Sequence, residues 1–588
     1  MKLSDYIVDY LTQAGIKHGF FMIGGALGHI ADSCALKKFK LYTMHHEQAA
    51  AFAAEGQAAA TQKPGLAMAT SGPGATNLIT GIGSAYYAST PTVFITGQVN
   101  TFESNIGGKR RQVGFQETDI VSIIRPITKY AMTISDPGKV CYELEKAVFL
   151  ATHGRNGPVL IDFPLDVQRA DISPAKQEHF TGSKEHNELS KKKQITKQEL
   201  DTFSTLLSNS ERPMILAGHG VRLSKARDEL RKFAEKTKIP VVASLMGTDS
   251  LPSHHPLYYG FIGTYGGRHA NFALANADLI IVFGARLDSR QIGVQALKFA
   301  PAAKIIHIDI DSSELGASVK EELSINADIK EFLSQALAIL PGMKPGNGWK
   351  SHLKWLKEKY GTQNQDAGRQ AINPVTALGA VSKAAKEESF VSVDVGAHQM
   401  WFAQAWQVKK NQTIFTNGGM GPMGCAIPTA IGAWLSDKSK SAWAVCGDGG
   451  FQLNIQELQT IVRNNIPLKI IILNNKSLGM LTQFQSENFE GRLIGSMDGY
   501  DTPDFVKVSN AYKIPAKRAE HPDELEEKIS WLANEENAAV LEIIIPNTFW
   551  TFPKATYSKP VYDMKPYLTD EEMQNALKYV WEACSKKK

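Results

Sequence analysis

Two apolar segments joined by an amphipathic one constrain the fold of this chain more than any other feature. Residues 441–445 (SAWAV) and 467–473 (PLKIIIL) are apolar enough to form buried strands. The segment between them, 451–465, has a helical pattern of apolar residues. One side of this predicted helix carries Leu453, Leu458, Ile461 and Val462. A strand, a helix and a second strand in this order predict a βαβ unit with parallel strands.

Polar residues follow both predicted strands. Gly447–Gly450 (GDGG) closes the first strand, and Asn474–Asn475 closes the second. In an open parallel sheet, ligands bind at the carboxyl ends of the strands, so Asp448 and Asn475 are expected to converge there. Carboxylate and amide oxygens suit Mg²⁺, which completes its shell with water and phosphate oxygens. Because the glycines leave a helix N-terminus open to phosphate, the pattern predicts a Mg²⁺-bridged diphosphate site.

The same alternation of strands and helices recurs along the 588 residues. Apolar runs followed by glycine turns occur in three blocks, which predicts three doubly wound parallel α/β domains. Two polar segments poor in large apolar residues, 174–194 and 341–349, are expected to be linkers. The expected domain bounds are 1–172, 195–342 and 368–550, followed by a tail at 551–588 that is expected to wrap the surface.

Charge and cysteine usage exclude several classes of protein. The 64 basic and 59 acidic residues leave a net charge of +5, which gives no case for a nucleic-acid or membrane surface. The five cysteines lie far apart without CxxC spacing, so neither a zinc site nor a disulfide framework is expected. We find no signal peptide and no segment apolar enough to span a bilayer. These features predict a cytoplasmic protein.

The stretch GDGGFQLNIQELQTIVRNNIPLKIIILNN (447–475) resembles the cofactor motif of enzymes that depend on thiamine diphosphate (ThDP). Its sequence is most similar to that of the acetolactate synthase group, and the resemblance covers nearly the whole chain. It implies that Asp448 and Asn475 bind Mg²⁺ through their side chains, and Ser477 through its backbone carbonyl. Ala397 stands where the family commonly has glutamine. The cofactor-binding residues that the resemblance implies are Val395, Gly396, Ala397, His398, Gly421, Met423, Gly449, Gly450, Ser477, Leu478, Gly479 and Met480, with Met423 under the bend of the cofactor.

ThDP chemistry also needs a carboxylic acid that shares a proton with the aminopyrimidine ring in a mostly dry place. The residues alone offer Glu47 and Glu55 on one alanine-rich predicted helix, and they do not decide between the two. An acid in the first helical turn is also a common complement to the helix dipole. The resemblance assigns the role to Glu47, because HEQAAAFAAEG matches the family segment with the activating glutamate. It also places Phe115, Gln116 and Gly25 near the reacting carbon, where the alternative for each is an ordinary turn or core residue.

The resemblance implies an acetolactate synthase-like transferase or lyase. Such an enzyme decarboxylates a 2-keto acid, here pyruvate, and adds the resulting hydroxyethyl carbanion to a carbonyl acceptor. The alternatives on the same cofactor are a C–C hydrolase, another lyase, a simple decarboxylase and an FAD-linked oxidase. A remote alternative is a catalytically silent regulatory or assembly paralogue. The family also implies a homodimer or homotetramer with active sites between chains.

Three further features bear on ligands. The middle block resembles the region that binds FAD in acetolactate synthase and ADP in other relatives, with Arg286 and Asp309 as candidate nucleotide contacts. Phe484 replaces the tryptophan of a family stretch that shapes the acceptor pocket, which leaves room for a larger acceptor. The run Lys109–Arg111 could recognise a carboxylate or phosphate, with a solvated loop as the alternative.

Overall fold

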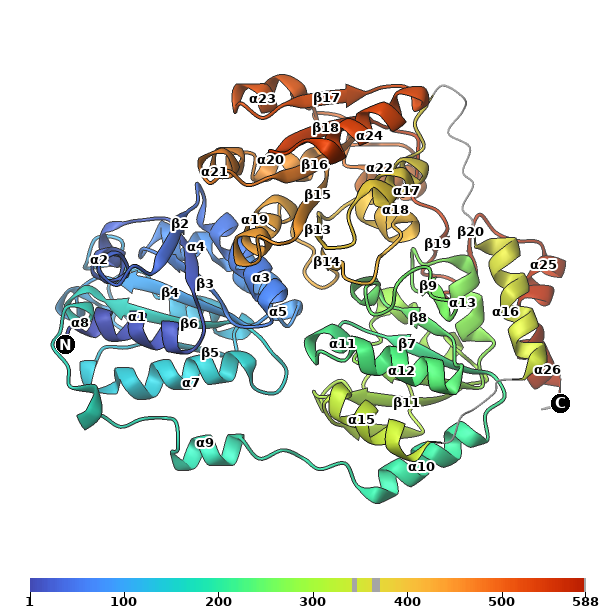
Figure 1. Cartoon of the computed structure of the whole chain (residues 1–588), viewed down its shortest axis with the longest axis horizontal. Coiled ribbons are helices and arrows are strands. Elements are labelled where there is room, and N and C mark those ends of the chain that lie inside the picture. Colours follow the sequence, from blue (N-terminus) through green and yellow to red (C-terminus); the bar gives the residue numbers. More distant parts are fainter. Residues whose placement is uncertain (341–345, 362–370, 586–588) are drawn as a thin grey trace.

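Three six-stranded parallel sheets form the framework of the molecule (Figure 1). The computed structural model describes residues 1–340, 346–361 and 371–585. Within each sheet every pair of neighbouring strands is parallel, as the alternating pattern predicts. Helices cover both faces of the sheets, so the predicted doubly wound α/β fold is confirmed (Figure 1).

The N-terminal sheet has the strand order β2-β1-β3-β4-β6-β5. Its strands are β1 (His18–Phe21), β2 (Lys40–Thr43), β3 (Gly65–Ala69), β4 (Thr92–Gln98), β5 (Tyr130–Thr133) and β6 (Val159–Pro164). Its helices are α1 (Leu3–Gln13), α2 (Gly28–Leu36), α3 (Glu47–Thr61), α4 (Pro73–Asn77), α5 (Ile79–Tyr87), α6 (Ile120–Ile124), α7 (Val140–Thr152) and α8 (Leu165–Gln168).

The central sheet has the order β12-β11-β10-β7-β8-β9. Its strands are β7 (Pro213–Ala217), β8 (Val241–Ala243), β9 (Tyr258–Phe261), β10 (Leu279–Phe283), β11 (Lys304–Asp309) and β12 (Leu323–Asn326). Its helices are α10 (Lys197–Ser208), α11 (Gly220–Leu223), α12 (Arg227–Thr237), α13 (Arg268–Ala275), α14 (Ser289–Ile292), α15 (Ile329–Ile339) and α16 (Asn347–Tyr360).

The C-terminal sheet has the order β14-β13-β15-β16-β18-β17, so β14 is an edge strand. Its strands are β13 (Ser389–Val393), β14 (Thr413–Thr416), β15 (Ser441–Gly447), β16 (Leu468–Asn474), β17 (Ala516–Ala519) and β18 (Ala539–Ile544). Its helices are α17 (Pro374–Ala384), α18 (Ala397–Ala405), α19 (Ala426–Ser436), α20 (Asp448–Leu453), α21 (Glu457–Arg463), α22 (Gly479–Asn488), α23 (Phe505–Ala511) and α24 (Leu525–Asn534).

Helices α3 and α19 join the N-terminal domain to the C-terminal one, and they lie side by side in Figure 1. Glycines let their backbones approach closely. A Cβ on Gly56 would lie 2.1 Å from the carbonyl oxygen of Thr429, and one on Gly432 would lie 1.9 Å from that of Ala53. Since no real side chain tolerates such distances, glycine at these two positions fixes how the two domains meet.

The predicted βαβ unit is present, but its helix differs from the prediction. Strands β15 and β16 are parallel neighbours, as expected. The segment between them forms two short helices, α20 and α21, rather than one. The break lies at Asn454, whose side chain donates to the carbonyl oxygen of Gly424 at 2.8 Å. The prediction that Leu453 lies on the apolar face is wrong, because it is 53% exposed.

The predicted linkers and tail contain more structure than their composition indicates. Segment 174–194 includes the short helix α9 (Lys184–Leu189). Of the second predicted linker, 341–345 lies outside the described residues and 347–349 already belongs to α16. The tail forms β19 (Lys554–Ala555), β20 (Met564–Lys565), α25 (Asp570–Ala576) and α26 (Lys578–Ser585) beside the central domain. It buries Met564 in the same apolar cluster as α13 and α16.

Candidate active site

The two predicted metal ligands lie at the same edge of the C-terminal sheet. Asp448 is the first residue of α20, directly after β15, and Asn475 directly follows β16. Because Gly447 pairs with Leu473 across these strands, the residues that follow emerge side by side. Both side chains are buried, and Asp448 Oδ2 has no hydrogen-bond partner among the described residues. A buried carboxylate oxygen without a partner fits a cation ligand.

The surroundings of Asp448 shift its acidity in both directions. Burial, the largest influence, raises the pKa of its carboxyl to about 6. The Gly449 amide and the Tyr500 hydroxyl oppose that rise by donating to Asp448 Oδ1 at 2.7 and 3.1 Å. A bound cation would favour the ionised carboxylate. Tyr500 is not among the site residues predicted from the sequence. It lies 52 residues after Asp448, and only the fold brings its hydroxyl to the carboxylate.

Protein side chains pack closely against the glycine that follows Asp448. A Cβ on Gly449 would lie 2.8 Å from Leu478 Cδ2 and 3.1 Å from both Met423 Cε and the Tyr500 hydroxyl. Met423, Leu478 and Tyr500 therefore surround this backbone at close range. The backbone N–H groups at the start of a helix are a usual place for a phosphate group to bind.

Residues of the segment after β13 complete this region. His398 is buried, which lowers the pKa of its imidazole to about 4 and leaves the ring neutral near pH 7. Its Nε2 has no hydrogen-bond partner among the described residues. Ala397 stands where glutamine is common in the family. Its Cβ lies 3.4 Å from the position of a Cβ on Gly479, so a small side chain at residue 397 fits the close approach of these two segments.

A cavity of about 1020 Å³ connects this region with the central domain. Its volume is at the upper end of the range usual for ligand pockets. Every predicted metal- and cofactor-binding residue lines it: Val395, Gly396, Ala397, His398, Gly421, Met423, Asp448, Gly449, Gly450, Asn475, Ser477, Leu478, Gly479 and Met480.

The four predicted catalytic residues gather elsewhere, at the carboxyl edge of the N-terminal sheet. Glu47 begins α3 and accepts a hydrogen bond from Asn77 Nδ2 at 2.9 Å. Gly74 lies beside Glu47, since a Cβ on this glycine would be 3.3 Å from Glu47 Oε1. Gly72 lies beside Gln116, since a Cβ there would be 3.0 Å from Gln116 Cβ. Gly25 faces open space.

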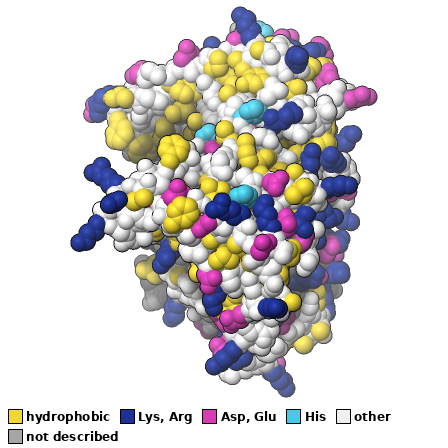
Figure 2. Space-filling view, turned by 90° about the vertical axis from the view of Figure 1, so that its left-hand side faces the viewer, with side chains coloured by type: hydrophobic (Ala, Val, Ile, Leu, Met, Phe, Trp, Pro, Cys, Tyr) yellow, Lys and Arg dark blue, Asp and Glu magenta, His cyan; other side chains and the backbone are white. Residues whose placement is uncertain are grey.

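The N-terminal edge is open in the single chain. Phe115 is 86% exposed, Phe102 73% and Ile23 55%. Figure 2 shows the side of the molecule on which the N-terminal domain lies, and hydrophobic side chains are visible there between charged ones. None of the four predicted catalytic residues lines the large cavity. Within one chain, the structure therefore keeps Glu47 apart from the cavity that Asp448 lines.

Glu55, the other acid that the residues alone allowed, lies deeper in α3. Ser84 donates to its carboxylate at 2.6 Å, and Asn417 Nδ2 donates to the Ser84 hydroxyl at 2.6 Å. Burial, the largest influence, raises its pKa to about 7. Glu55 thus lies two turns further along α3, away from the carboxyl edge of the sheet, and it is as buried as Glu47, with 8% against 7% of the residue exposed.

The central domain contributes the other part of the cavity wall. The glycine turns after β7 and β10 are in contact, since a Cβ on Gly218 would lie 2.0 Å from the Gly284 carbonyl oxygen. Arg286 and Asp309 both line the cavity, as does Arg290, which sequence reasoning did not select. Arg286 forms its ion pair with Asp288, at 3.2 Å.

Sets of metal-ligating side chains and membrane spans are both absent from the described part of the chain. No group of three or more His, Cys, Asp or Glu side chains that could hold a metal ion occurs there. Among the described residues, no helix has the length and apolar character needed to cross a membrane.

Three family models match the chain in order. Residues 1–123 match the N-terminal TPP binding domain of thiamine pyrophosphate enzymes, residues 200–336 match the central domain, and residues 394–543 match the C-terminal TPP binding domain. Thiamine pyrophosphate is another name for ThDP. The three matched regions carry the three parallel sheets.

Curated relatives are similar over nearly the whole chain. A protein named probable acetolactate synthase large subunit from Methanocaldococcus jannaschii is 37% identical over 93% of this chain and 92% of its own length. The acetolactate synthase large subunit of Lactococcus lactis is 35% identical over 94% and 93%. Acetolactate synthase 2, chloroplastic, from Nicotiana tabacum is 36% identical over 94% of this chain and 83% of its own length. The chain thus belongs to the thiamine pyrophosphate enzymes, within the group of acetolactate synthase large subunits.

Proposed function

We propose that this protein is a Mg²⁺- and ThDP-dependent carboligase that decarboxylates pyruvate and joins its two-carbon unit to a carbonyl acceptor. The observation that carries the proposal is the unpartnered Asp448 Oδ2 at the N-terminus of α20, beside the cavity that every predicted metal- and cofactor-binding residue lines. That donor set suits a Mg²⁺-bound diphosphate. The relatives named acetolactate synthase indicate the reaction class.

The proposal gives each group of side chains a task. Asp448, Asn475 and the Ser477 carbonyl would hold Mg²⁺, and Gly449 with its neighbours would hold the diphosphate. Met423 would support the bend of the cofactor from below. ThDP, when bound, supplies an electron sink at its thiazolium ring.

We further propose that the active site is shared between two chains of a homodimer, which could also pair into a tetramer. Glu47 would hold a proton at the aminopyrimidine of ThDP bound in the partner's cavity, with Gly25, Phe115 and Gln116 beside the reacting carbon. Two observations support this: Glu47 lies outside the cavity of its own chain, and Phe115 is 86% exposed. Phe102 and Ile23 are exposed in the same domain, and a group of exposed apolar side chains is typical of a surface that a partner covers.

The central part of the cavity is proposed to bind FAD, or ADP. Arg286 and Asp309 line it. We keep the domain bounds 1–172, 195–342, 368–550 and 551–588 as a proposal, noting that residues 341–342, 368–370 and 586–588 lie outside the described residues. A reducing compartment such as the cytoplasm is proposed because four cysteines are free and buried.

The experiment that tests the proposed function is a turnover assay on the purified protein. Pyruvate, Mg²⁺ and ThDP are supplied with and without keto-acid, aldehyde and keto-sugar acceptors, and the products are identified by mass spectrometry. Acetolactate from pyruvate alone, dependent on both ThDP and Mg²⁺, is the expected result. Aldehyde release without ligation, or no pyruvate consumption under any condition, would refute a pyruvate carboligase.

A larger or anionic acceptor is a second candidate. Phe484 is 41% exposed in place of the family tryptophan, and Lys109, Arg110 and Arg111 are exposed on the loop that precedes Phe115. Glu117 orders that loop by accepting from the Val113 amide at 2.7 Å. In the same assay, pyruvate consumption only in the presence of a keto-sugar or phosphorylated acceptor would favour this candidate.

A further inference from the structure

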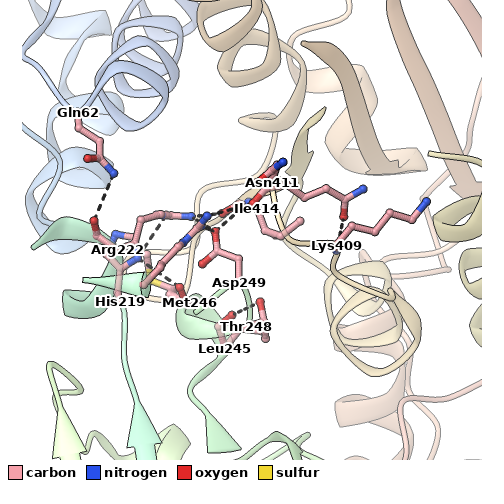
Figure 3. Close-up of polar contacts among 12 residues, drawn as sticks. Gln62, His219, Arg222, Leu245, Met246, Thr248, Asp249, Lys409, Asn411 and Ile414 are labelled. Carbon is pink, nitrogen blue, oxygen red and sulfur yellow. Dashed lines mark hydrogen bonds and ion pairs between the residues drawn. The ribbon is translucent and has the colours of Figure 1, made fainter. Parts of the chain in front are cut away.

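A buried ionic cluster joins the three domains behind the wall of the cavity (Figure 3). The carboxylate of Asp249 accepts a hydrogen bond from Arg222 Nη1 at 2.8 Å and another from Arg227. The Asp249 side chain is 1% exposed. Gln62 of the N-terminal domain donates to the carbonyl oxygen of Arg222 at 3.4 Å. One carboxylate therefore balances two guanidinium groups where the domains meet.

The cluster binds the open side of edge strand β14. The Ile414 amide donates to Asp249 at 3.1 Å, and the Ile414 carbonyl oxygen accepts from Arg222. Two residues earlier, the Gln412 carbonyl oxygen accepts from Arg227 Nη1 at 3.1 Å. Residues two apart face the same side of a strand, so these are the outward backbone groups that a further strand would pair. The ionic side chains of the central domain take the place of that strand.

The anchored strand leads directly into the cavity. After Thr416 the chain forms the segment 417–423, which we call the thiamine loop and which ends at Met423. Gly418 of this loop packs on Met246, since a Cβ on Gly418 would lie 3.0 Å from Met246 Cγ. Met246 lines the cavity and stands three residues before Asp249. Asp249 therefore fixes both sides of this contact: the strand before the thiamine loop and the segment on which the loop packs.

His219 lies between the cluster and Met246, and its Nδ1 can hydrogen-bond to only one of them at a time, because a nitrogen of the neutral ring carries either a hydrogen or a lone pair. Arg222 Nη2 lies 3.3 Å from His219 Nδ1, and that nitrogen is 3.3 Å from the Met246 carbonyl oxygen. Burial, the largest influence, and the nearby Arg222 charge lower the pKa of His219 to about 3, so the ring is neutral. Burial raises the pKa of Asp249, but Arg222 and Arg227 outweigh it and hold that pKa below its ordinary value.

We propose that Asp249 is a positioning residue for the thiamine loop: by anchoring β14 to the central domain it sets where Met423 lies beneath ThDP. The inference rests on the proposed function. Asp249 is not among the residues that line the cavity, so it acts through β14 rather than by touching a ligand. Without its charge, two buried guanidinium groups lose their counter-ion and the hold on Ile414 weakens.

The test compares Asp249→Asn with the parent protein and with a matched control. The control is Asp278→Asn, which changes another carboxylate of the central domain that accepts from the Arg212 amide at 2.9 Å and lies outside the cavity. Each apoprotein is titrated with ThDP in excess Mg²⁺, and the near-ultraviolet circular dichroism of the bound cofactor, the thermal midpoint and kcat are recorded. We expect Asp249→Asn to weaken ThDP binding about tenfold and to alter the cofactor spectrum, because a small misplacement of a positioned group has effects of that order.

The control should keep its ThDP affinity within about twofold of the parent, since its site is independent of the thiamine loop. A folded Asp249→Asn protein with parent-like affinity and cofactor spectrum would overturn the proposal. If that variant does not fold, Arg227→Met is used as the test instead. It removes the hydrogen bond to the Gln412 carbonyl oxygen and keeps the ion pair between Asp249 and Arg222. Weaker ThDP binding with a changed spectrum would support the proposal, and parent-like values would overturn it. Failure of the parent itself to bind ThDP would instead refute the proposed function.

Discussion

At the residue scale, Glu47 and Glu55 share helix α3 but have different surroundings. Glu47 is buried at the carboxyl edge of the N-terminal sheet and accepts one hydrogen bond from Asn77. Glu55 lies inside, bonded to Ser84. Burial does not separate the two acids, but Glu47 lies at the edge where ligands bind to parallel sheets, which favours it as the acid that serves the cofactor.

Glu47→Gln is expected to bind ThDP normally and to lose most turnover. The amide keeps the shape of the side chain but cannot exchange a proton, and such a loss typically costs about 10²–10⁴ in rate. The measurement is kcat together with a ThDP titration of the apoprotein. Glu55→Gln is the matched control on the same helix and should retain most of its activity. Near-parental kcat in Glu47→Gln would contradict the assignment.

Gly449→Ala is expected to weaken ThDP binding without a large change in the thermal midpoint. The new methyl would lie 2.8 Å from Leu478 Cδ2 and 3.1 Å from Met423 Cε. The Kd for ThDP at saturating Mg²⁺ is the measurement, and an increase of about tenfold or more is expected because the methyl would displace the ends of Leu478 and Met423, which line the cavity proposed for the cofactor. An unchanged Kd would show that the cofactor does not lie over this glycine.

Glu55 predicts a pH dependence of stability. Its folded pKa of about 7 exceeds the ordinary 4.5, so the folded state holds this proton more tightly than the unfolded chain. Its contribution to stability is therefore fully present below the ordinary pKa and is lost as pH rises through about 7. Relative to the parent protein, Glu55→Gln should gain thermal stability as pH rises from about 5 to about 8. An equal difference in thermal midpoint at both pH values would contradict the buried-carboxyl account.

At the scale of elements, the contact of α3 with α19 depends on glycine at two positions. Gly432→Ala is expected to destabilise the protein strongly, because the methyl would lie 1.9 Å from the Ala53 carbonyl oxygen. The cost of such overpacking is on the order of 1–3 kcal/mol or more. Gly28→Ala in α2 is the control, since nothing lies within 4 Å of its Cβ position. Equal thermal midpoints for the two variants would contradict the close approach of α3 and α19.

The elements also show what the sequence could predict. Strands β15 and β16 were predictable because their apolar runs are continuous and end in polar turns, and these turns locate Asp448 and Asn475. The break between α20 and α21 was not predictable, because the Asn454 side chain reaches the Gly424 carbonyl oxygen only in the folded chain. Tyr500 and the Asp249 cluster were not predictable for the same reason, since their partners lie far away in sequence.

At the scale of the whole molecule, one chain carries two separate parts of the proposed active site. The cavity holds the predicted metal- and cofactor-binding residues, whereas Glu47 and Phe115 lie at another edge. The three-block order was predictable from the sequence, but the separation of these parts within one chain required the structure. A second copy would bring them together and would cover the exposed Phe115.

Complementation of two inactive variants tests this central claim most directly. Glu47→Gln and Asp448→Asn are each purified and assayed alone, and are then co-expressed and assayed as a mixture. If the site is shared, each mixed dimer has one intact site, and about a quarter of the parental activity should return under random pairing of the chains. No recovery, in a mixture shown by differential tags to contain mixed dimers, would contradict an active site built from Glu47 of one chain and Asp448 of the other.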